Sequence, residues 1–469
     1  MKNTLAPINQ IPPEILTLIP GFWDLRRRDR RIIALTHVCQ VWREIFVSCS
    51  SLWTYFVRGW GATKTRTYLE RSRSSPINLR LSMGDFSPHR DPLFQIISPA
   101  LGRLKSLSAG VTWDTLQGIT ACLSRPAPLL ERLEIDGCTG CAPARYPELT
   151  TVLFGGEFPS LRELRIAFVR TELPWRNMTA LTSFTLNHTP PDSISIGQLL
   201  DFFESVPRLR EIELEGATPT SGAQNGRSVS LMCLRTMDIL FGMPSSLLLD
   251  HLSIPVGAEL KIQVHSFDRI VEGCLPTSLD NPRNLSNVIK INLSVSSSHP
   301  QMQLSGPNGI FHVAALHSGG AWSALELLTR LDTSKTEELD IAYSVPLPSN
   351  LTHRALLPMG NLRSLTLSDR QTSHTSEHVL NPDKTPSNVV VFPKLEELSF
   401  IPNTNMESFN VRPVIEMAAA RASRGAKLRT VRIIDRVNKL GWEDALELRK
   451  HVLHVEYGSD VISRGRIWR

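Results

Sequence analysis

A six-residue hydrophobic pattern, Leu-x-x-Leu-x-Leu with apolar substitutions, recurs through most of this chain and restricts what the chain can fold into. One copy is "LRELRI", with Leu161, Leu164 and Ile166. Successive side chains of a strand point to opposite faces, so the last two apolar residues of each copy share one face of a short strand. Other full copies begin at Leu130, Leu181, Leu209, Leu234, Leu362, Leu395 and Leu428, and partial copies include Leu104 and Leu339.

The spacing of the copies indicates a repeat array. Neighbouring copies start 20 residues apart at Leu161 and Leu181, and 33 residues apart at Leu362 and Leu395. These intervals straddle the period of roughly 20–29 residues that is typical of leucine-rich repeats. In such arrays each strand is followed by a helix or loop that returns over the core.

Two stretches contain both halves of a repeat. In "SIGQLLDFFESVPRLREIEL", apolar residues from Ile196 to Val206 have helical spacing, Pro207 ends the helix, and a strand follows. "SSLLLDHLSIPVGAELKIQV" has the same order of helix, proline and strand. The sequence therefore predicts an α/β protein in which residues 76–457 form a curved leucine-rich-repeat-like solenoid.

Three segments depart from the repeat. "NVIKINLSVSSS" and "MQLSGPNGIFHVAAL" alternate like strands, and "GPNG" is a hairpin signal, so a strand-rich irregular section is expected near residues 285–316. Residues 368–388 are polar and are expected to form a long surface loop. We expect residues 458–469 to be a C-terminal tail.

The first 57 residues follow a helical pattern instead. "IPPEIL" places prolines where a helix can begin, and Pro20 and Gly21 should end that helix early. Apolar residues from Ile32 to Phe46 then recur at steps of three and four, which predicts one amphipathic helix. Residues 8–57 are therefore expected to form a small helical domain, and the polar, basic residues 58–75 a linker.

Composition limits the partners and the cellular compartment that we expect for this chain. Among 469 residues the formal net charge is +6, which is mild for this length and weak evidence for nucleic acid, so nucleic acid is not among the expected partners. Seven scattered cysteines suggest no disulfide framework and favour a reducing compartment. Because no signal peptide or long apolar run is visible, we expect an intracellular chain, cytoplasmic or nuclear, without a membrane partner.

Few motifs suggest chemistry. In "CTGC", Cys138 and Cys141 lack two further ligands or a redox context, and a repeat loop is the favoured interpretation. "RRRDRR", residues 26–31, is interpreted as a solvated helix face rather than an import signal. His37 and Cys39 would diverge on a helix, which argues against a shared metal. We therefore expect no catalytic residue, cofactor or metal, although a hydrolase assembled from distant residues stays open as an alternative.

The N-terminal segment resembles an F-box, and is similar to those of the large basidiomycete-type fungal families. The resemblance is carried by "INQIPPEIL", "ALTHVCQVWREI" and "SLWTYF", in that order. The remainder resembles the degenerate leucine-rich region that often follows an F-box in those proteins.

This resemblance implies a function. An F-box docks on the Skp-type adaptor of a cullin ubiquitin ligase, and the repeats recruit the protein substrate, whose identity the sequence does not indicate. The F-box protein itself performs no chemistry. Carried over by motif position, the adaptor-binding candidates are Ile11, Pro12, Ile15, Leu16, Val38, Cys39, Trp42, Ile45, Leu52 and Trp53. A leucine-rich scaffold acting outside a degradative ligase is the main alternative.

Overall fold

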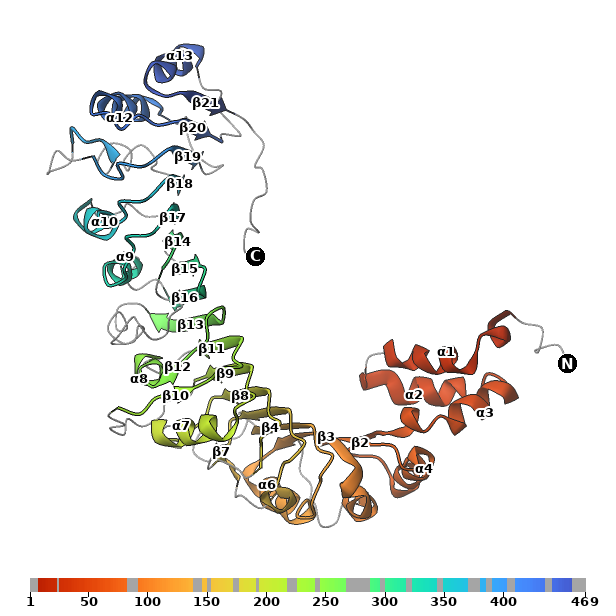
Figure 1. The fold of residues 1–469 in the computed structure, drawn as a ribbon. Helices are drawn as coiled ribbons and strands as arrows, with labels where there is room; N and C mark the ends of the chain where they lie inside the picture. Colours follow the sequence, from red (N-terminus) through yellow and green to blue (C-terminus); the bar gives the residue numbers. More distant parts are fainter. Residues whose placement is uncertain are drawn as a thin grey trace. The chain divides into compact units, whose positions relative to one another are not determined.

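A computed structural model gives the structure of the chain and divides it into two compact units. Unit 1 comprises Met1–Arg210 and Gly216–Gly222, and unit 2 comprises Glu211–Glu215 and Ala223–Arg469. The described residues are 7–22, 25–81, 92–137, 146–149, 153–171, 177–190, 194–216, 226–240, 245–266, 287–295, 300–317, 323–343, 349–369, 380–384, 390–402, 410–434 and 441–457. They form a mixed α/β protein with a mostly parallel sheet and twelve α-helices (Figure 1). The expected α/β class is confirmed at this level.

The N-terminal part of unit 1 is helical. Its first helix starts at a proline, whose missing N–H costs nothing in the first turn. The side chains of Leu16, Phe46 and Trp53 are buried, and the Trp53 Nε1 donates a hydrogen bond to the carbonyl of Phe46 at 2.9 Å. The helical segments are η2 (Pro7–Gln10), α1 (Pro13–Leu18), η3 (Ile19–Phe22), α2 (Leu25–Leu35), α3 (Gln40–Ser48) and η4 (Ser50–Trp53).

The single amphipathic helix expected from Ile32 to Phe46 is wrong, because the chain forms α2 and α3 with a turn between them. The Thr36 hydroxyl donates to the carbonyl of Ile33 at 2.6 Å, and the Arg43 Nε donates to the carbonyl of Thr36 at 3.0 Å. Such local side-chain bonds compete with helix continuation. Cys39 is extended, with φ −159°, and stands at the N-cap of α3, so the helical geometry assumed for His37 and Cys39 does not apply.

Residues 58–75, expected to be a linker, contain a packed helix. Helix α4 (Ala62–Ser72) buries Tyr68, whose ring centroid lies 4.9 Å from that of Trp53. The guanidinium of Arg71 lies 4.3 Å from the centre of the Trp53 ring. Paired aromatic rings stabilise a core beyond the area that they bury. This segment is therefore part of the hydrophobic core of unit 1.

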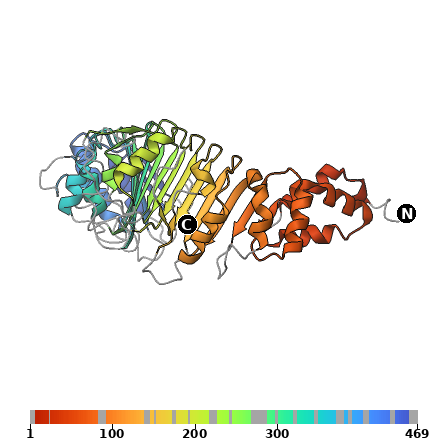
Figure 2. The same ribbon diagram turned by 90° about the horizontal axis from the view of Figure 1, so that it is seen from below.

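The sheet of unit 1 begins inside the segment that was expected to be wholly helical. Strand β1 (Tyr55–Val57) pairs in parallel with β2 (Ile77–Leu81), and each later strand pairs in parallel with the one before it (Figure 2). Repeat positions share a register, so that Leu133 lies opposite Leu164, which lies opposite Phe184. The later strands are β3 (Leu104–Val111), β4 (Arg132–Gly137), β6 (Glu163–Ala167) and β8 (Ser183–Asn187), and a separate short pair is β5 (Glu148–Leu149) and β7 (Arg170–Thr171).

The sheet of unit 2 is parallel except for one inserted hairpin. The strands are β9 (Glu211–Glu215), β11 (Thr236–Leu240), β13 (Glu259–Ser266), β14 (Lys290–Val295), β15 (Gln301–Gly306), β16 (Gly309–His317), β17 (Glu338–Tyr343), β18 (Ser364–Asp369), β19 (Glu397–Pro402), β20 (Thr430–Ile433) and β21 (His454–Tyr457). The next strand in the sequence, β14, does not pair with β13. Instead β16 pairs with β13, β15 pairs antiparallel with β16 and β14, and β14 pairs with β17.

Three paired strands thus lie near residues 285–316, in the order β14, β15, β16 across the sheet. The turn at Pro307 and Asn308 joins β15 to β16 in two residues, which suits a tight hairpin. The β14–β15–β16 meander therefore extends the sheet with three strands where a regular repeat would add one.

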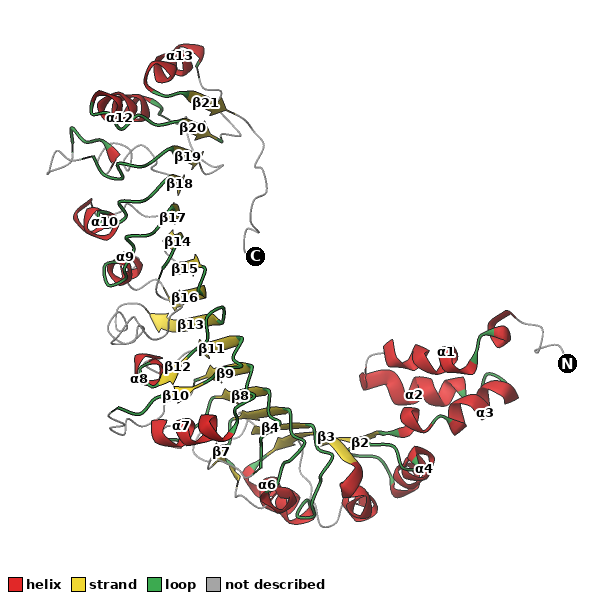
Figure 3. Cartoon of the chain, in the orientation of Figure 1, coloured by secondary structure: helices red, strands yellow, loops and turns green. Residues whose placement is uncertain are grey.

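The helices lie to one side of each sheet and leave the other side open (Figure 3). Along every central strand the buried residues alternate with half-exposed ones, as in Leu339 and Asp340 of β17. The helices of unit 1 beyond the N-terminal set are α5 (Pro92–Ile97), α6 (Trp113–Cys122) and α7 (Ile196–Ser205), with a 3-10 turn at η5 (Ser98–Arg103) and the short η6 (Leu153–Gly156). Those of unit 2 are α8 (Ser245–Leu249), α9 (Ser323–Leu328), α10 (Ser349–Leu356), α12 (Arg412–Ser423) and α13 (Trp442–His451), beside the pair β10 (Val229–Ser230) and β12 (Leu252–Ser253).

Some expectations fall outside the described residues. These are the "CTGC" loop at Cys138 and Cys141, most of the polar loop at 368–388, and the tail at 458–469. Of the helices in the described ranges, none is both long and apolar enough to span a membrane.

Candidate functional site

The N-terminal helices carry an exposed apolar surface. The side chains of Ile15, Leu18 and Val38 are 52%, 59% and 56% exposed, and Ile8 and Val41 are also exposed. Large exposed apolar side chains within one short segment are candidates for contact with a partner. We call Ile8, Ile15, Leu18, Val38 and Val41 the apolar surface of unit 1.

The structure separates the ten predicted adaptor-binding residues into exposed, half-buried and buried ones. The sequence alone does not indicate this separation. Pro12, Ile15 and Val38 are exposed, and Ile11, Cys39 and Ile45 are half-buried. The remaining four, Leu16, Trp42, Leu52 and Trp53, are buried and pack the helices together. Trp42 contacts Phe46 with 5.6 Å between ring centroids. In the free chain these four side chains therefore stabilise the domain rather than face a partner.

A groove lies between α1 and α3. It encloses about 530 Å³ and is lined by Pro13, Glu14 and Thr17 from α1, and by Glu44, Ile45, Ser48 and Cys49 from α3 and its end. The Glu44 carboxylate accepts a hydrogen bond from the Gln40 amide at 3.0 Å. One of the predicted residues, Ile45, thus forms part of the wall of a groove.

The second candidate surface is the open face of the unit 2 sheet. Because the strands are in register, the half-exposed residues form rows that cross the strands. The middle row runs through Glu213, Asp238, Lys261, His312, Gln303, Asn292, Asp340, Thr366, Ser399 and Arg432. Asp340 is the one carboxylate between Lys261 and Arg432 in this row, and Ser399 is buried although it belongs to the row.

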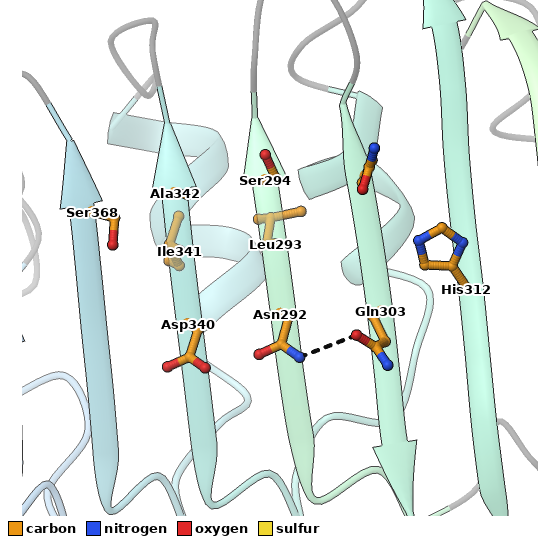
Figure 4. Close-up of a pocket in the computed structure, with 10 residues that line it drawn as sticks. Asn292, Leu293, Ser294, Gln303, His312, Asp340, Ile341, Ala342 and Ser368 are labelled. Carbon is orange, nitrogen blue, oxygen red and sulfur yellow. Dashed lines mark hydrogen bonds between the residues drawn. The ribbon is translucent and has the colours of Figure 1, made fainter. Parts of the chain in front are cut away.

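A hollow of about 140 Å³ lies in the middle of this face (Figure 4). Asn292 stands between Asp340 and Gln303, and its amide nitrogen donates to the Gln303 Oε1 at 3.3 Å. The small side chains Ser294, Ala342 and Ser368 form one side of the lining. Amide, hydroxyl and carboxylate groups reach the hollow, but most of its surface is apolar.

Ion pairs and burial set the electrostatics of the open face. The Lys290 ammonium lies 2.9 Å from the Glu338 carboxylate and 3.3 Å from that of Asp340. Burial raises the pKa of Asp238, and the nearby carboxylates of Glu259 and Glu213 raise it further against the opposing effect of Lys261. Burial also lowers the pKa of His312, which favours its neutral imidazole.

The open face of unit 1 has a different character. Arg132 donates to both carboxylate oxygens of Glu163, with 2.8 Å between the Nη2 and Oε1. This hydrogen bond lowers the pKa of Glu163. Lys105 lies 3.4 Å from Glu131, and a hollow of about 320 Å³ is lined by these four residues with Asn78, Ser106 and Arg162. Opposite charges alternate along this face and neutralise one another.

The described residues contain no group of three or more His, Cys, Asp or Glu arranged to hold a metal ion. The free cysteines Cys39, Cys49, Cys122 and Cys233 are scattered, and burial raises the pKa of the Cys122 thiol, which disfavours the thiolate. Sequence reasoning did not single out the polar rows of the open face. The polar residues that form these rows stand at the variable positions of each Leu-x-Leu. Which of them become neighbours depends on strand register, which the sequence does not specify.

Comparison with protein-family models finds no match for this chain, and comparison with curated proteins finds none either.

Proposed function

We propose that this chain is a non-catalytic substrate-recognition subunit of a Skp–cullin–F-box type ubiquitin ligase. The apolar surface of unit 1 is the observation that carries the proposal. Its members lie on short helices and, for Val38, in the turn between α2 and α3, in a segment whose sequence resembles an F-box. A small helical segment that leaves several large apolar side chains exposed is suited to a partner that covers them.

The proposal assigns different tasks to the ten candidate residues. Ile15 and Val38 contact the adaptor directly, and Ile45 contributes to the groove between α1 and α3. Trp42 and Trp53 hold the helices in place. The repeats of both units form a leucine-rich-repeat-like solenoid whose open strand faces recruit the protein substrate, and catalysis belongs to a conjugating enzyme held elsewhere in the ligase.

Adaptor capture tests the proposal with a matched pair of variants. Val38 and Val256 are 56% and 53% exposed, and only Val38 belongs to the apolar surface. We expect Val38→Asp to weaken capture of the purified Skp-type adaptor by at least about tenfold, because burying an unpaired charge in an apolar interface costs more than 1 kcal/mol. Val256→Asp should capture the adaptor as the parent chain does.

Two outcomes would count against the ligase role. If the folded parent chain fails to capture the adaptor, or if both variants capture it equally, the apolar surface is not an adaptor site. If the adaptor is captured but the cullin does not co-purify, the alternative of a leucine-rich scaffold outside a degradative ligase is favoured.

A further inference from the structure

The open face of unit 2 is acidic although the whole chain is basic. Within its described strands this face carries nine acidic side chains and three from lysine or arginine, whereas the chain has a formal net charge of +6. The acidic residues are Glu211, Glu213, Glu215, Asp238, Glu259, Glu338, Asp340, Glu397 and Glu456, and the basic ones are Lys261, Lys290 and Arg432. An acidic surface attracts positively charged partners and repels negatively charged ones, whatever the net charge of the whole chain.

The acidic excess is concentrated at one end of the face. Strands β9, β11 and β13 present five carboxylates and only one cation, Lys261. Lys261 lies 3.3 Å from Glu259 and 3.9 Å from Asp238, so its charge is already shared between two carboxylates.

The hollow beside this end accepts hydrogen bonds. The Asn292 amide nitrogen is directed at Gln303, which leaves the Asn292 oxygen on the side of Asp340. The Asp340 carboxylate, which Lys290 already contacts at 3.3 Å, and the Asn292 oxygen thus lie on neighbouring strands. The small side chain of Ala342 stands two residues along β17 from Asp340. A guanidinium carries five donors in one plane and no acceptor, so it can donate to both of these oxygens, and the apolar stem of arginine suits the mostly apolar surface around them.

The distance across the strands sets the length of the partner segment. From β11 to β17 the sheet crosses five strand spacings, through β13, β16, β15 and β14. At about 4.8 Å per spacing this is roughly 24 Å, which an extended peptide covers with about seven residues. A short linear segment can therefore contact the acidic end and the hollow at once.

We propose that the open face of unit 2 binds a lysine- and arginine-rich segment of a partner protein, with one arginine side chain in the hollow beside Asn292 and Asp340. This inference rests on the proposed function, in which the open strand faces recruit the substrate, and it names the chemistry of that substrate. The acidic end attracts the segment and the hollow holds one residue of it.

Peptide binding to the full chain tests this inference. The probe is a fluorescein-labelled 12-residue peptide in which arginine alternates with serine, and the comparison peptide has glutamate in place of arginine. Fluorescence anisotropy in 50 mM and 300 mM sodium chloride should show the arginine peptide binding at least about tenfold more tightly at the lower salt, because exposed charges are screened at the higher. Equal affinity for the two peptides would overturn the inference.

Matched variants separate this face from general electrostatics. Glu211→Gln with Glu213→Gln removes two charges from the acidic end, and Glu443→Gln with Glu447→Gln removes two exposed charges from α13. We expect the first pair to weaken arginine-peptide binding by about fivefold and the second to leave it within about twofold, since close charges act most strongly. An equal loss in both pairs would contradict a site on this face.

Filling the hollow tests the arginine position. Ala342→Leu adds bulk on the open side of β17 without entering the buried side. It should weaken the arginine peptide by about fivefold more than a lysine peptide of the same pattern, because only the guanidinium makes several planar bonds there. An equal effect on both peptides would refute the hollow as an arginine site.

Adaptor capture on the same preparations keeps the two proposals apart. The Glu211→Gln and Glu213→Gln pair should capture the adaptor normally while losing peptide affinity. Failure of every preparation to capture the adaptor, with peptide discrimination intact, would contradict the ligase role alone.

Discussion

At the scale of single residues, burial decides which motif positions can meet a partner. Val38 and Trp42 belong to the same short motif, yet Val38 is exposed and Trp42 packs on Phe46. The apolar type of both residues was evident from the sequence. Their division was not, because it depends on the turn at Thr36–Val38, which reorients the chain before α3 begins.

Arg421 is a buried cation whose bonds are all to backbone. Its side chain is 0% exposed, and its guanidinium donates to the carbonyl of Val391 at 2.6 Å and to that of Phe392 at 2.8 Å. We expect Arg421→Met to lower the free energy of unfolding by about 2–4 kcal/mol, because two buried carbonyls lose their donors, at about 1–3 kcal/mol each, while one desolvated charge is removed. Urea denaturation followed by circular dichroism measures this change.

The control for this variant is Arg424→Met, one turn further along. The Arg424 side chain is only partly buried and pairs with Asp383 at 2.6 Å, so its loss should cost less than about 1 kcal/mol. Burial lowers the pKa of Arg421 to about 10, so its buried charge disfavours the folded state below about pH 10. A loss at Arg421→Met no larger than that at Arg424→Met would show that the two carbonyl bonds contribute little.

Glu163 links acid sensitivity to one ion pair in unit 1. The hydrogen bond from Arg132 lowers the pKa of Glu163 below 4.5, so its contribution to stability is present above pH 4.5 and is lost as the pH falls through the lowered value. Glu163→Gln should lower the free energy of unfolding by about 0.5 kcal/mol at pH 7, since the pair is half-exposed. Urea titrations at pH 7 and pH 3.5 should show a smaller difference at the lower pH, and a constant difference would argue against the pair.

At the scale of secondary-structure elements, local signals were sufficient to place most strands and several helices. Each Leu-x-Leu copy falls on a strand, and the "GPNG" turn joins β15 to β16. The sequence does not indicate which strands pair, because either β14 or β16 could pair with β13. Only the packing of the whole sheet places β16 beside β13 and β14 beside β17.

Helix α7 gives a prediction about local stability. Ser195 accepts a hydrogen bond from the Gln198 N–H at 3.2 Å, and the Gln198 side chain accepts one from the Ser195 N–H at 2.8 Å. Ser195→Ala removes the side-chain half of this capping box and should cost about 1 kcal/mol, or roughly fivefold in hydrogen-exchange protection of Ile196–Ser205. Ser205→Ala, at the other end of the same helix, is the control and should leave the protection of the first turn unchanged.

At the scale of the whole molecule, each unit combines a buried leucine side with an open polar side. The buried side follows from the repeats, because every copy directs its last two apolar residues inward. The charge of the open side differs between the units. Ion pairs such as that of Arg132 with Glu163 balance it in unit 1, whereas acidic residues predominate in unit 2. A single net charge of +6 for the chain conceals this difference.

By itself, the sequence determined the α/β class, the strands that carry a Leu-x-Leu copy and the helical character of most of the N-terminal segment. These features depend on local periodicity and on proline and glycine, which act within a few residues. Only the tertiary structure decided the order of β14, β15 and β16, the packing of α4, and the rows that bring Asp238, Asn292 and Asp340 onto one face. Those outcomes depend on pairing between residues far apart in the chain, which local patterns do not specify.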